Sequence, residues 1–292
     1  MAAVPAVRIE HLVKVFRLPT LRKREVRAVD DVSFTIAPGE VYGLIGPNGS
    51  GKSTTLKVLL GLLRATSGTA EIFGQDSLKT GSRDAVGYLP ENPYFYKHLS
   101  GLETLQFYGK LCGLGCRALR ERTAELLRLV RLEPAASRAV GSYSKGMLQR
   151  IGLAQALVQN PRMVVLDEPT AGVDPAGSRT IRDLILELKA RGITVILTSH
   201  LLEQVQEVCD RIGIMSRGRM VRQGPLEELI ALQDRQEIVL QGATPDLLEK
   251  IRLLVAQDAR ASLVHAGNSR TTLEHLYLEV TGAAEEEHPA AH

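Results

Sequence analysis

A glycine-rich segment near the start of the chain has the residue types that hold a row of phosphate groups. It matches the pattern GxxxxGK[ST], in which glycines let backbone N–H groups point at phosphate oxygens. In that pattern Lys52 neutralises the outer phosphates and Ser53 ligates Mg²⁺. An apolar run over 41–45 precedes the segment and a helical pattern follows it, so we expect a phosphate-binding loop. The loop consists of Gly46, Pro47, Asn48, Gly49, Ser50, Gly51, Lys52, Ser53 and Thr54.

Two strand-like runs end in side chains that could complete such a site. The run 163–166 is followed by Asp167 and Glu168, and the run 194–199 is followed by His200. Ligands collect at the carboxyl ends of strands in open α/β sheets, where Asp167 would hold Mg²⁺ and Glu168 would polarise the attacking water. Taken alone, a carboxylate pair is more often a strand end with a helix cap, and a lone histidine is structural about as often as functional. The neighbouring phosphate loop favours the functional interpretation of the carboxylates.

The elements that must position these residues follow an alternating pattern. Short β-branched runs alternate with helical patterns up to about residue 222, which predicts an α/β fold with a mostly parallel sheet. The expected strands are 32–36, 41–45, 86–89, 163–166, 194–197 and 212–215. The expected helices are 52–63, 101–111, 119–132, 145–158, 176–190 and 201–209.

The segment from about 92 to 141 departs from this alternation, because it is mainly helical and predicts an inserted α-helical subdomain. Six of the chain's 7 Tyr and 5 Phe residues lie at its entrance: Tyr88, Tyr94, Phe95, Tyr96, Phe107 and Tyr108. These aromatic side chains could form a surface for a partner, since aromatic residues are enriched at interfaces. They could equally form the small core of the subdomain itself.

The end of the chain follows a third pattern. Helical segments at 226–232, 245–255 and 271–279 alternate with strand-like segments at 236–240 and 262–265, which predicts a small α+β accessory domain over 226–282. The last residues, 283–292, are rich in Ala and Glu, and we expect them to form a disordered tail.

The composition excludes several classes of protein. Hydrophobic residues make up 44% and charged residues 24%, as in a globular chain, and no apolar run approaches the roughly 20 residues of a membrane-spanning helix. The net charge of +3 is too small to indicate nucleic-acid binding. The start of the chain has no basic region followed by a long apolar segment, and the 3 cysteines are an odd number at unrelated positions. We therefore expect a cytosolic protein without disulfides.

The segment Tyr143-Ser144-Lys145-Gly146-Met147-Leu148-Gln149-Arg150 resembles the signature motif of ATP-binding cassette (ABC) ATPases. The resemblance extends from about Val7 to Pro225 with the motifs in the family's order. It implies a P-loop NTPase core of the ABC type over 1–225, with ATP and Mg²⁺ as cofactors. The appendage after Pro225 resembles the carboxyl-terminal segment common in exporter ATPases of this family.

The resemblance assigns roles to individual residues. It implies that Glu168 and His200 are catalytic, that Phe16 stacks on adenine, and that Asp174 couples the two subunits of a dimer. It also implies that a partner's Ser144, Lys145 and Gly146 contact the γ-phosphate. The metal ligands implied are Ser53, Glu91 and Asp167.

Three positions differ from the usual family pattern. Lys145 stands where glycine is commonest, and we expect it to add positive charge near the γ-phosphate. Met147 stands where glutamine is commonest. Glu91 replaces a glutamine that touches Mg²⁺, and a carboxylate can still ligate this ion.

The function implied is that of an ATPase subunit of a transporter, and an exporter is favoured over an importer. Its expected partners are a second ABC ATPase subunit in a head-to-tail homodimer and a separate polytopic permease, at the inner face of the plasma membrane. The alternative is a soluble ABC ATPase acting on ribosomes or DNA. The single phosphate loop and the short segment between Ser53 and Ser144 argue against it, and we expect no nucleic-acid partner. A GTPase is disfavoured because no NKxD element is present.

Overall fold

The computed structural model describes residues 4–17, 25–200, 202–230 and 244–256. Its central sheet has six strands in the order β10-β9-β3-β8-β7-β6. Neighbouring strands are parallel except at the edge, where β10 runs antiparallel to β9. The strands are β3 (Val41–Ile45), β6 (Val86–Leu89), β7 (Met163–Asp167), β8 (Thr194–Ser199), β9 (Arg211–Ser216) and β10 (Arg219–Pro225). Every residue of β3, β7 and β8 is buried, as expected for parallel strands covered on both faces, and the prediction of a mostly parallel sheet is confirmed.

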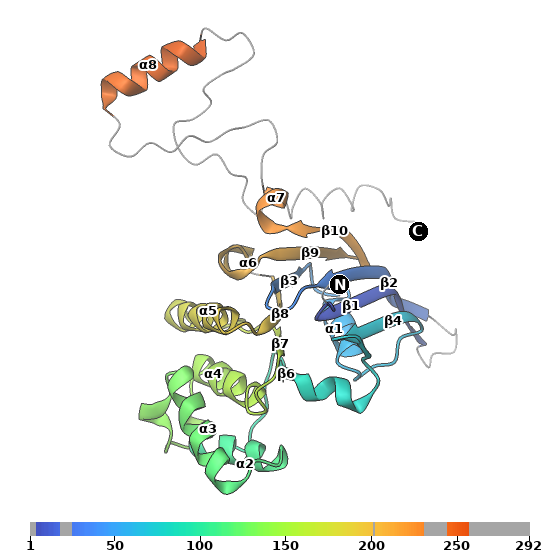
Figure 1. The fold of residues 1–292 in the computed structure, drawn as a ribbon, viewed down its shortest axis with the longest axis vertical. Coiled ribbons are helices and arrows are strands. Elements are labelled where there is room, and N and C mark those ends of the chain that lie inside the picture. Colours follow the sequence, from blue (N-terminus) through green and yellow to red (C-terminus); the bar gives the residue numbers. More distant parts are fainter. Residues whose placement is uncertain (1–3, 18–24, 201, 231–243, 257–292) are drawn as a thin grey trace, which may run out of the picture.

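A second sheet, which is antiparallel, lies beside the first (Figure 1). It contains β1 (Val7–Arg17), β2 (Glu25–Ile36), β4 (Ser67–Ile72) and β5 (Gln75–Asp76), in the order β2-β1-β4-β5. Of these strands, only 32–36 was predicted, and the antiparallel sheet was not. Residues His11 and Asp31 have positive φ angles, and the pairing of β1 with its neighbours shifts register near them. These bulges interrupt the two-residue alternation from which a strand is predicted.

The helices are α1 (Lys52–Leu59), α2 (Gly101–Leu111), α3 (Cys116–Leu129), α4 (Lys145–Ala156), α5 (Pro175–Ala190) and α6 (Leu202–Val208). Short 3₁₀ turns occur at Thr80–Ala85, Glu133–Ala135 and Val140–Ser142. The expected inserted helices are present between β6 and α4, where α2 begins at a capping box formed by Ser100 and Glu103. The expected helix 52–63 is too long, because Gly61 adopts a left-handed conformation with φ of 67° and the helix ends before it.

Two hydrophobic clusters cover the two faces of the central sheet. One cluster packs α1 between the sheets, through residues such as Leu56, Leu59 and Tyr42. The other joins the opposite face to α4, α5 and α6 and continues into the inserted helices through residues such as Leu105 and Leu126 (Figure 1). The inserted helices therefore share a core with the sheet that carries the candidate site.

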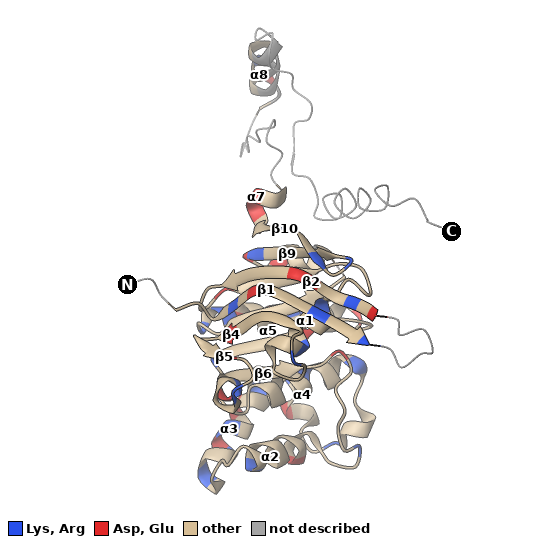
Figure 2. Ribbon diagram, turned by 90° about the vertical axis from the view of Figure 1, so that its right-hand side faces the viewer, with Lys and Arg blue, Asp and Glu red and all other residues tan. Residues whose placement is uncertain are grey.

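Lys and Arg residues occur together with Asp and Glu residues on both sheets and on the inserted helices (Figure 2). In the described part of the chain, no helix is both long and apolar enough to cross a bilayer. At the carboxyl-terminal end, α7 (Leu226–Ile230) and α8 (Pro245–Ala256) occupy two of the expected helices. The expected elements 236–240, 262–265 and 271–279 and the tail 283–292 lie outside the described residues.

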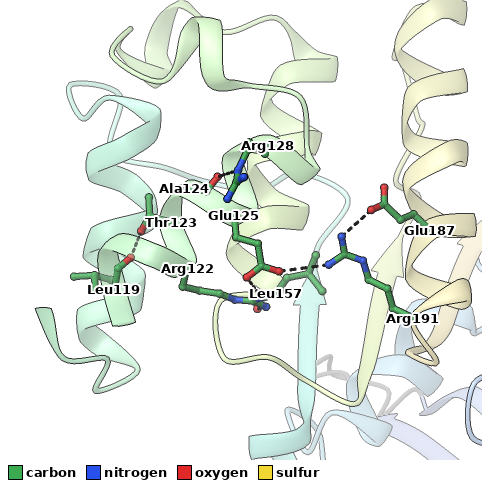
Figure 3. Close-up of polar contacts among 9 residues, drawn as sticks. All are labelled: Leu119, Arg122, Thr123, Ala124, Glu125, Arg128, Leu157, Glu187 and Arg191. Atoms are coloured by element: carbon green, nitrogen blue, oxygen red, sulfur yellow. Dashed lines mark hydrogen bonds and ion pairs between the residues drawn. The ribbon is translucent and has the colours of Figure 1, made fainter. Parts of the chain in front are cut away.

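Ion pairs connect the inserted helices to α5 (Figure 3). Glu125 on α3 contacts the guanidinium of Arg122 at 2.7 Å and that of Arg191, just after α5, at 3.4 Å. Arg122 also donates to the carbonyl oxygen of Leu157 at 2.5 Å, and Arg191 pairs with Glu187 at 2.7 Å. Partial burial raises the pKa of Glu125, but the two guanidinium groups outweigh it and hold this pKa below its usual value.

Helix α4 approaches β6 so closely that a side chain cannot fit between them. A Cβ atom on Gly87 would lie 2.1 Å from the carbonyl oxygen of Ala156, at the end of α4. We expect Gly87→Ala to lower the free energy of unfolding by about 1 to 3 kcal/mol, because the helix must shift away from the strand.

Urea unfolding followed by circular dichroism would measure this loss. Gly115→Ala is the matched control, since a Cβ atom at Gly115 meets nothing within 4 Å and its φ of −70° suits alanine. Equal stability of the two variants would contradict the close packing of α4 on β6.

Candidate nucleotide-binding site

The register of the central sheet brings the candidate residues to one edge. Ile45 at the end of β3 lies opposite Ser199 at the end of β8, and Asp167 at the end of β7 lies opposite Thr198. The phosphate loop follows β3, Glu168 follows β7 and His200 follows β8. Because these strands are parallel neighbours, segments far apart in the sequence meet where ligands bind in such sheets.

The phosphate loop has a backbone that glycine residues permit. Gly51 has a φ of 102°, and a Cβ atom there would lie 2.5 Å from the carbonyl oxygen of Ala28 on β2. A Cβ atom on Gly46 would lie 2.3 Å from the carbonyl oxygen of Met215 on β9. Gly51 is also the N-cap of α1 and offers no side-chain cap. The first N–H groups of α1, together with its dipole, are therefore available to an anion.

Lys52 extends over this loop rather than into solvent. Its Nζ donates to the carbonyl oxygens of Gly46 at 2.6 Å and Pro47 at 3.1 Å, and the residue is only 6% exposed. Burial lowers the pKa of Lys52, while the carboxylates of Glu168 and Asp167 act in the opposite direction. The ammonium group therefore lies between the loop and the two acidic residues.

Glu168 and His200 form a close pair. The Nδ1 atom of His200 lies 2.7 Å from Oε2 of Glu168, and the backbone N–H of His200 also points at that oxygen, at 3.4 Å. The Glu168 side chain is 11% exposed and the His200 side chain 53%. Glu168 thus presents a nearly buried carboxylate held by a histidine at the sheet edge, as a group that activates water requires.

Oxygen donors available near Lys52 suit Mg²⁺. Ser53 lies in the first turn of α1 with an exposed side chain, and Asp167 is 7% exposed. A hydroxyl and a carboxylate are hard oxygen ligands, and Mg²⁺ usually takes its remaining ligands from phosphates and water. The residues present therefore fit a magnesium ion bound together with a nucleotide.

The signature residues form a separate group. Ser144 is the N-cap of α4, as expected, and its Oγ accepts from the N–H of Met147 at 3.3 Å. The Lys145 ammonium lies against Gly172, where a Cβ atom would be 2.6 Å from Nζ, and Gly146 packs against Val173. Among the described residues, no recorded hydrogen bond or ion pair joins this group to the phosphate loop of the same chain.

Asp174 belongs to the signature group as well. It is the N-cap of α5, and its Oδ2 accepts from the N–H of Gly177 at 3.3 Å. A Cβ atom on Gly146 would lie 3.7 Å from its Oδ1. Asp174 therefore fixes the start of α5 directly beside the start of α4.

Phe16 and Glu91 lie at the margins of the site. Phe16 is half-buried opposite Val26 on β2, the strand that reaches the loop through Ala28, and the Lys14 Nζ lies 5.1 Å from its ring centroid. Glu91 is exposed, two residues beyond β6, and its carbonyl oxygen accepts from Nε2 of Gln149 at 2.8 Å.

The sequence analysis assigned no separate role to Gln149. It is buried on α4, so it links the signature helix directly to the backbone of Glu91. Its place within the signature segment was the signal that could have indicated this link.

Comparisons with known proteins support the nucleotide site. A family model described as "ABC transporter" matches residues 29–171. An uncharacterized ABC transporter ATP-binding protein of Synechocystis is 39% identical over 247 residues, covering 84% of this chain and 70% of the relative. The fluoroquinolones export ATP-binding protein of Mycobacterium tuberculosis is 39% identical over 225 residues, covering 76% of this chain and 72% of the relative.

A solved structure shares the fold and carries ligands. It is a dimeric ATP-binding cassette in a post-hydrolysis state with ADP and Pi, and it superposes with a TM-score of 0.68 at 25% identity. The match covers 75% of this chain and 98% of that one.

Proposed function

Because this chain belongs to the ABC transporter family and is an ATPase, we propose that it powers export across a membrane through a separate permease. The observation that carries the proposal is the assembly at one sheet edge of the Lys52 loop with the paired Glu168 and His200. The fluoroquinolones export protein among its relatives supports export as the direction.

Within the site, we assign the binding of ATP to the phosphate loop. Its N–H groups and Lys52 hold the phosphates, and Phe16 offers a ring on which adenine stacks. Glu168 accepts a proton from the attacking water, and His200 orients the Glu168 carboxylate through the 2.7 Å contact. Ser53 and Asp167, with Glu91, would hold Mg²⁺, which neutralises charge on the β- and γ-phosphates when bound.

We assign the signature group to a second copy of this chain. Ser144, Lys145 and Gly146 lie beside Asp174 and make no recorded polar contact with their own phosphate loop, in the part of the chain that is described. Their helix start offers an anion site to a nucleotide held by another subunit. The dimeric relative supports a head-to-tail homodimer with two ATP molecules between the subunits.

The aromatic residues at the entrance of the inserted helices divide into two sets. Phe95 is 6% exposed and belongs to the hydrophobic core, where it meets Tyr108 edge-on. Tyr94 and Tyr96 are 82% and 52% exposed, and Leu102 on α2 is 39% exposed. We propose these three side chains, the aromatic surface, as the contact for the permease.

Substituting both exposed tyrosines tests this contact. We expect Tyr94→Ser with Tyr96→Ser to bind ATP and dimerise normally but to lose the copurifying membrane protein, because only the exposed apolar area is removed. Leu111→Ser is the matched control, since Leu111 is 69% exposed at the other end of α2. A double variant that retained its membrane partner would exclude the aromatic surface as the contact.

The experiment that tests the whole proposal uses a Glu168→Gln chain, which should hold ATP in the closed dimer. The tagged variant is expressed in its native host, membranes are extracted gently with ATP present, and copurifying proteins are identified by mass spectrometry. A stoichiometric polytopic membrane protein is expected, placing the chain at the cytoplasmic face of the membrane. Ribosomal proteins or nucleic acid in its place would favour the soluble alternative, although the mixed charge in Figure 2 disfavours it.

A further inference from the structure

A buried hydroxyl group connects the two acidic residues of the site. Thr198 lies on β8 with none of its surface exposed, and its Oγ1 donates to Oδ1 of Asp167 at 2.6 Å. The same Oγ1 accepts from the backbone N–H of Glu168 at 3.0 Å. A threonine hydroxyl has one hydrogen to donate, so the donation to Asp167 and the acceptance from Glu168 use it in both directions.

The backbone of Glu168 needs this support because of its conformation. Its φ angle is 50°, in the left-handed region that residues other than glycine seldom adopt. Such a conformation persists only where the surroundings hold it. The N–H of Glu168 is held by Oγ1 of Thr198 at 3.0 Å and by the carbonyl oxygen of Thr198 at 3.2 Å.

The end of β8 therefore holds Glu168 at two points. Thr198 holds its backbone, and His200, two residues further on, holds its carboxylate at 2.7 Å. Thr198 alone also reaches Asp167, the neighbouring carboxylate. Valine would fill the same space in this buried strand without a polar group to desolvate, so the hydroxyl is tied to its two partners.

We propose that Thr198 is a positioning residue that sets the Asp167 carboxylate and the Glu168 backbone relative to each other. It orients the carboxylate that would hold Mg²⁺ and places the base at the correct distance from the γ-phosphate. Groups that orient metal ligands typically contribute about 10- to 100-fold to metal affinity or activity. This inference rests on the roles proposed above for Asp167 and Glu168.

Thr198→Val removes the hydroxyl and keeps the shape of the side chain. We expect kcat for ATP hydrolysis to fall about 10- to 100-fold, and the Mg²⁺ concentration that half-saturates binding of a fluorescent ADP analogue to rise about tenfold. Binding of the analogue without Mg²⁺ should be unchanged. Thr198→Ser restores the hydroxyl and should return both quantities to near the wild-type values.

A threonine on the same strand provides the matched control. Thr194 is also fully buried, and its Oγ1 accepts from the N–H of Gly39 at 2.9 Å, at the opposite end of β8. Thr194→Val should lose a comparable hydrogen bond without changing the Mg²⁺ requirement. An equal change in the Mg²⁺ requirement in Thr194→Val and Thr198→Val would show a general effect on the strand and overturn the proposal.

Two further variants separate the possible failures. If Thr198→Val does not fold, Thr198→Ala removes the hydroxyl without the branched methyl group, and wild-type behaviour of Thr198→Ala would overturn the inference. Asp167→Asn tests the metal role by itself. A wild-type Mg²⁺ requirement in Asp167→Asn would overturn that role and the role of Thr198 together. An impaired Asp167→Asn beside unimpaired Thr198 variants would overturn only the latter.

Discussion

Lys52→Ala should abolish productive ATP binding, because it removes the cation that lies over the phosphate loop. Loss of a hydrogen bond to a charged group costs about 1.5 to 3 kcal/mol, which corresponds to about 10- to 150-fold weaker binding. Turnover should fall further, since the outer phosphates would lose both neutralisation and positioning. Fluorescence anisotropy with a labelled nucleotide measures affinity, and phosphate release measures turnover.

Lys57→Ala is the control for this substitution. Lys57 lies on the same helix, α1, but its side chain is exposed in the last turn. Both variants lose one positive charge and keep the same helix propensity, so only the loss of the loop contact distinguishes them. Nucleotide affinity in Lys52→Ala equal to that in Lys57→Ala would contradict the role of Lys52.

Glu168→Gln should bind ATP normally and hydrolyse it about 10²- to 10⁴-fold more slowly, the range over which general bases contribute. Glutamine has nearly the same shape, and its side-chain oxygen can keep the contact with His200, but it cannot take a proton from water. Because hydrolysis reopens the dimer in the proposed cycle, the variant should accumulate as a dimer with ATP and Mg²⁺. Size-exclusion chromatography with bound-nucleotide analysis would detect this species.

Glu187→Gln serves as the control, since Glu187 lies on α5 and pairs with Arg191 at 2.7 Å. It should retain wild-type turnover and show no accumulation of dimer. Hydrolysis by Glu168→Gln at the wild-type rate would remove Glu168 from the role of base. Slow hydrolysis without dimer accumulation would retain that role but contradict the coupling of closure to ATP.

The antiparallel sheet shows why local patterns predicted the fold incompletely. In β1 and β2, the bulges near His11 and Asp31 shift the register, so the alternation of apolar residues does not persist along the strands. The central strands were predictable because continuous burial makes them short uninterrupted apolar runs. Helix ends depended on single glycine conformations such as that of Gly61, whose φ angle the sequence does not specify.

The sequence by itself determined the phosphate loop, the signature segment and the family. These features are contiguous, and their chemistry follows from residue types at fixed spacing, as with the glycines and Lys52. The helix caps at Ser144 and Asp174 are also local, because a cap bonds to N–H groups within three residues.

Only the tertiary structure decided which distant groups work together. The parallel register of β7 and β8 brings Thr198 and His200 onto Asp167 and Glu168, about 30 residues away in the chain. The positive φ angle of Glu168 then directs its N–H to Thr198 and its carboxylate to His200. Sequence spacing carries no information on these bonds, because their geometry depends on how neighbouring strands align and on backbone angles set by packing.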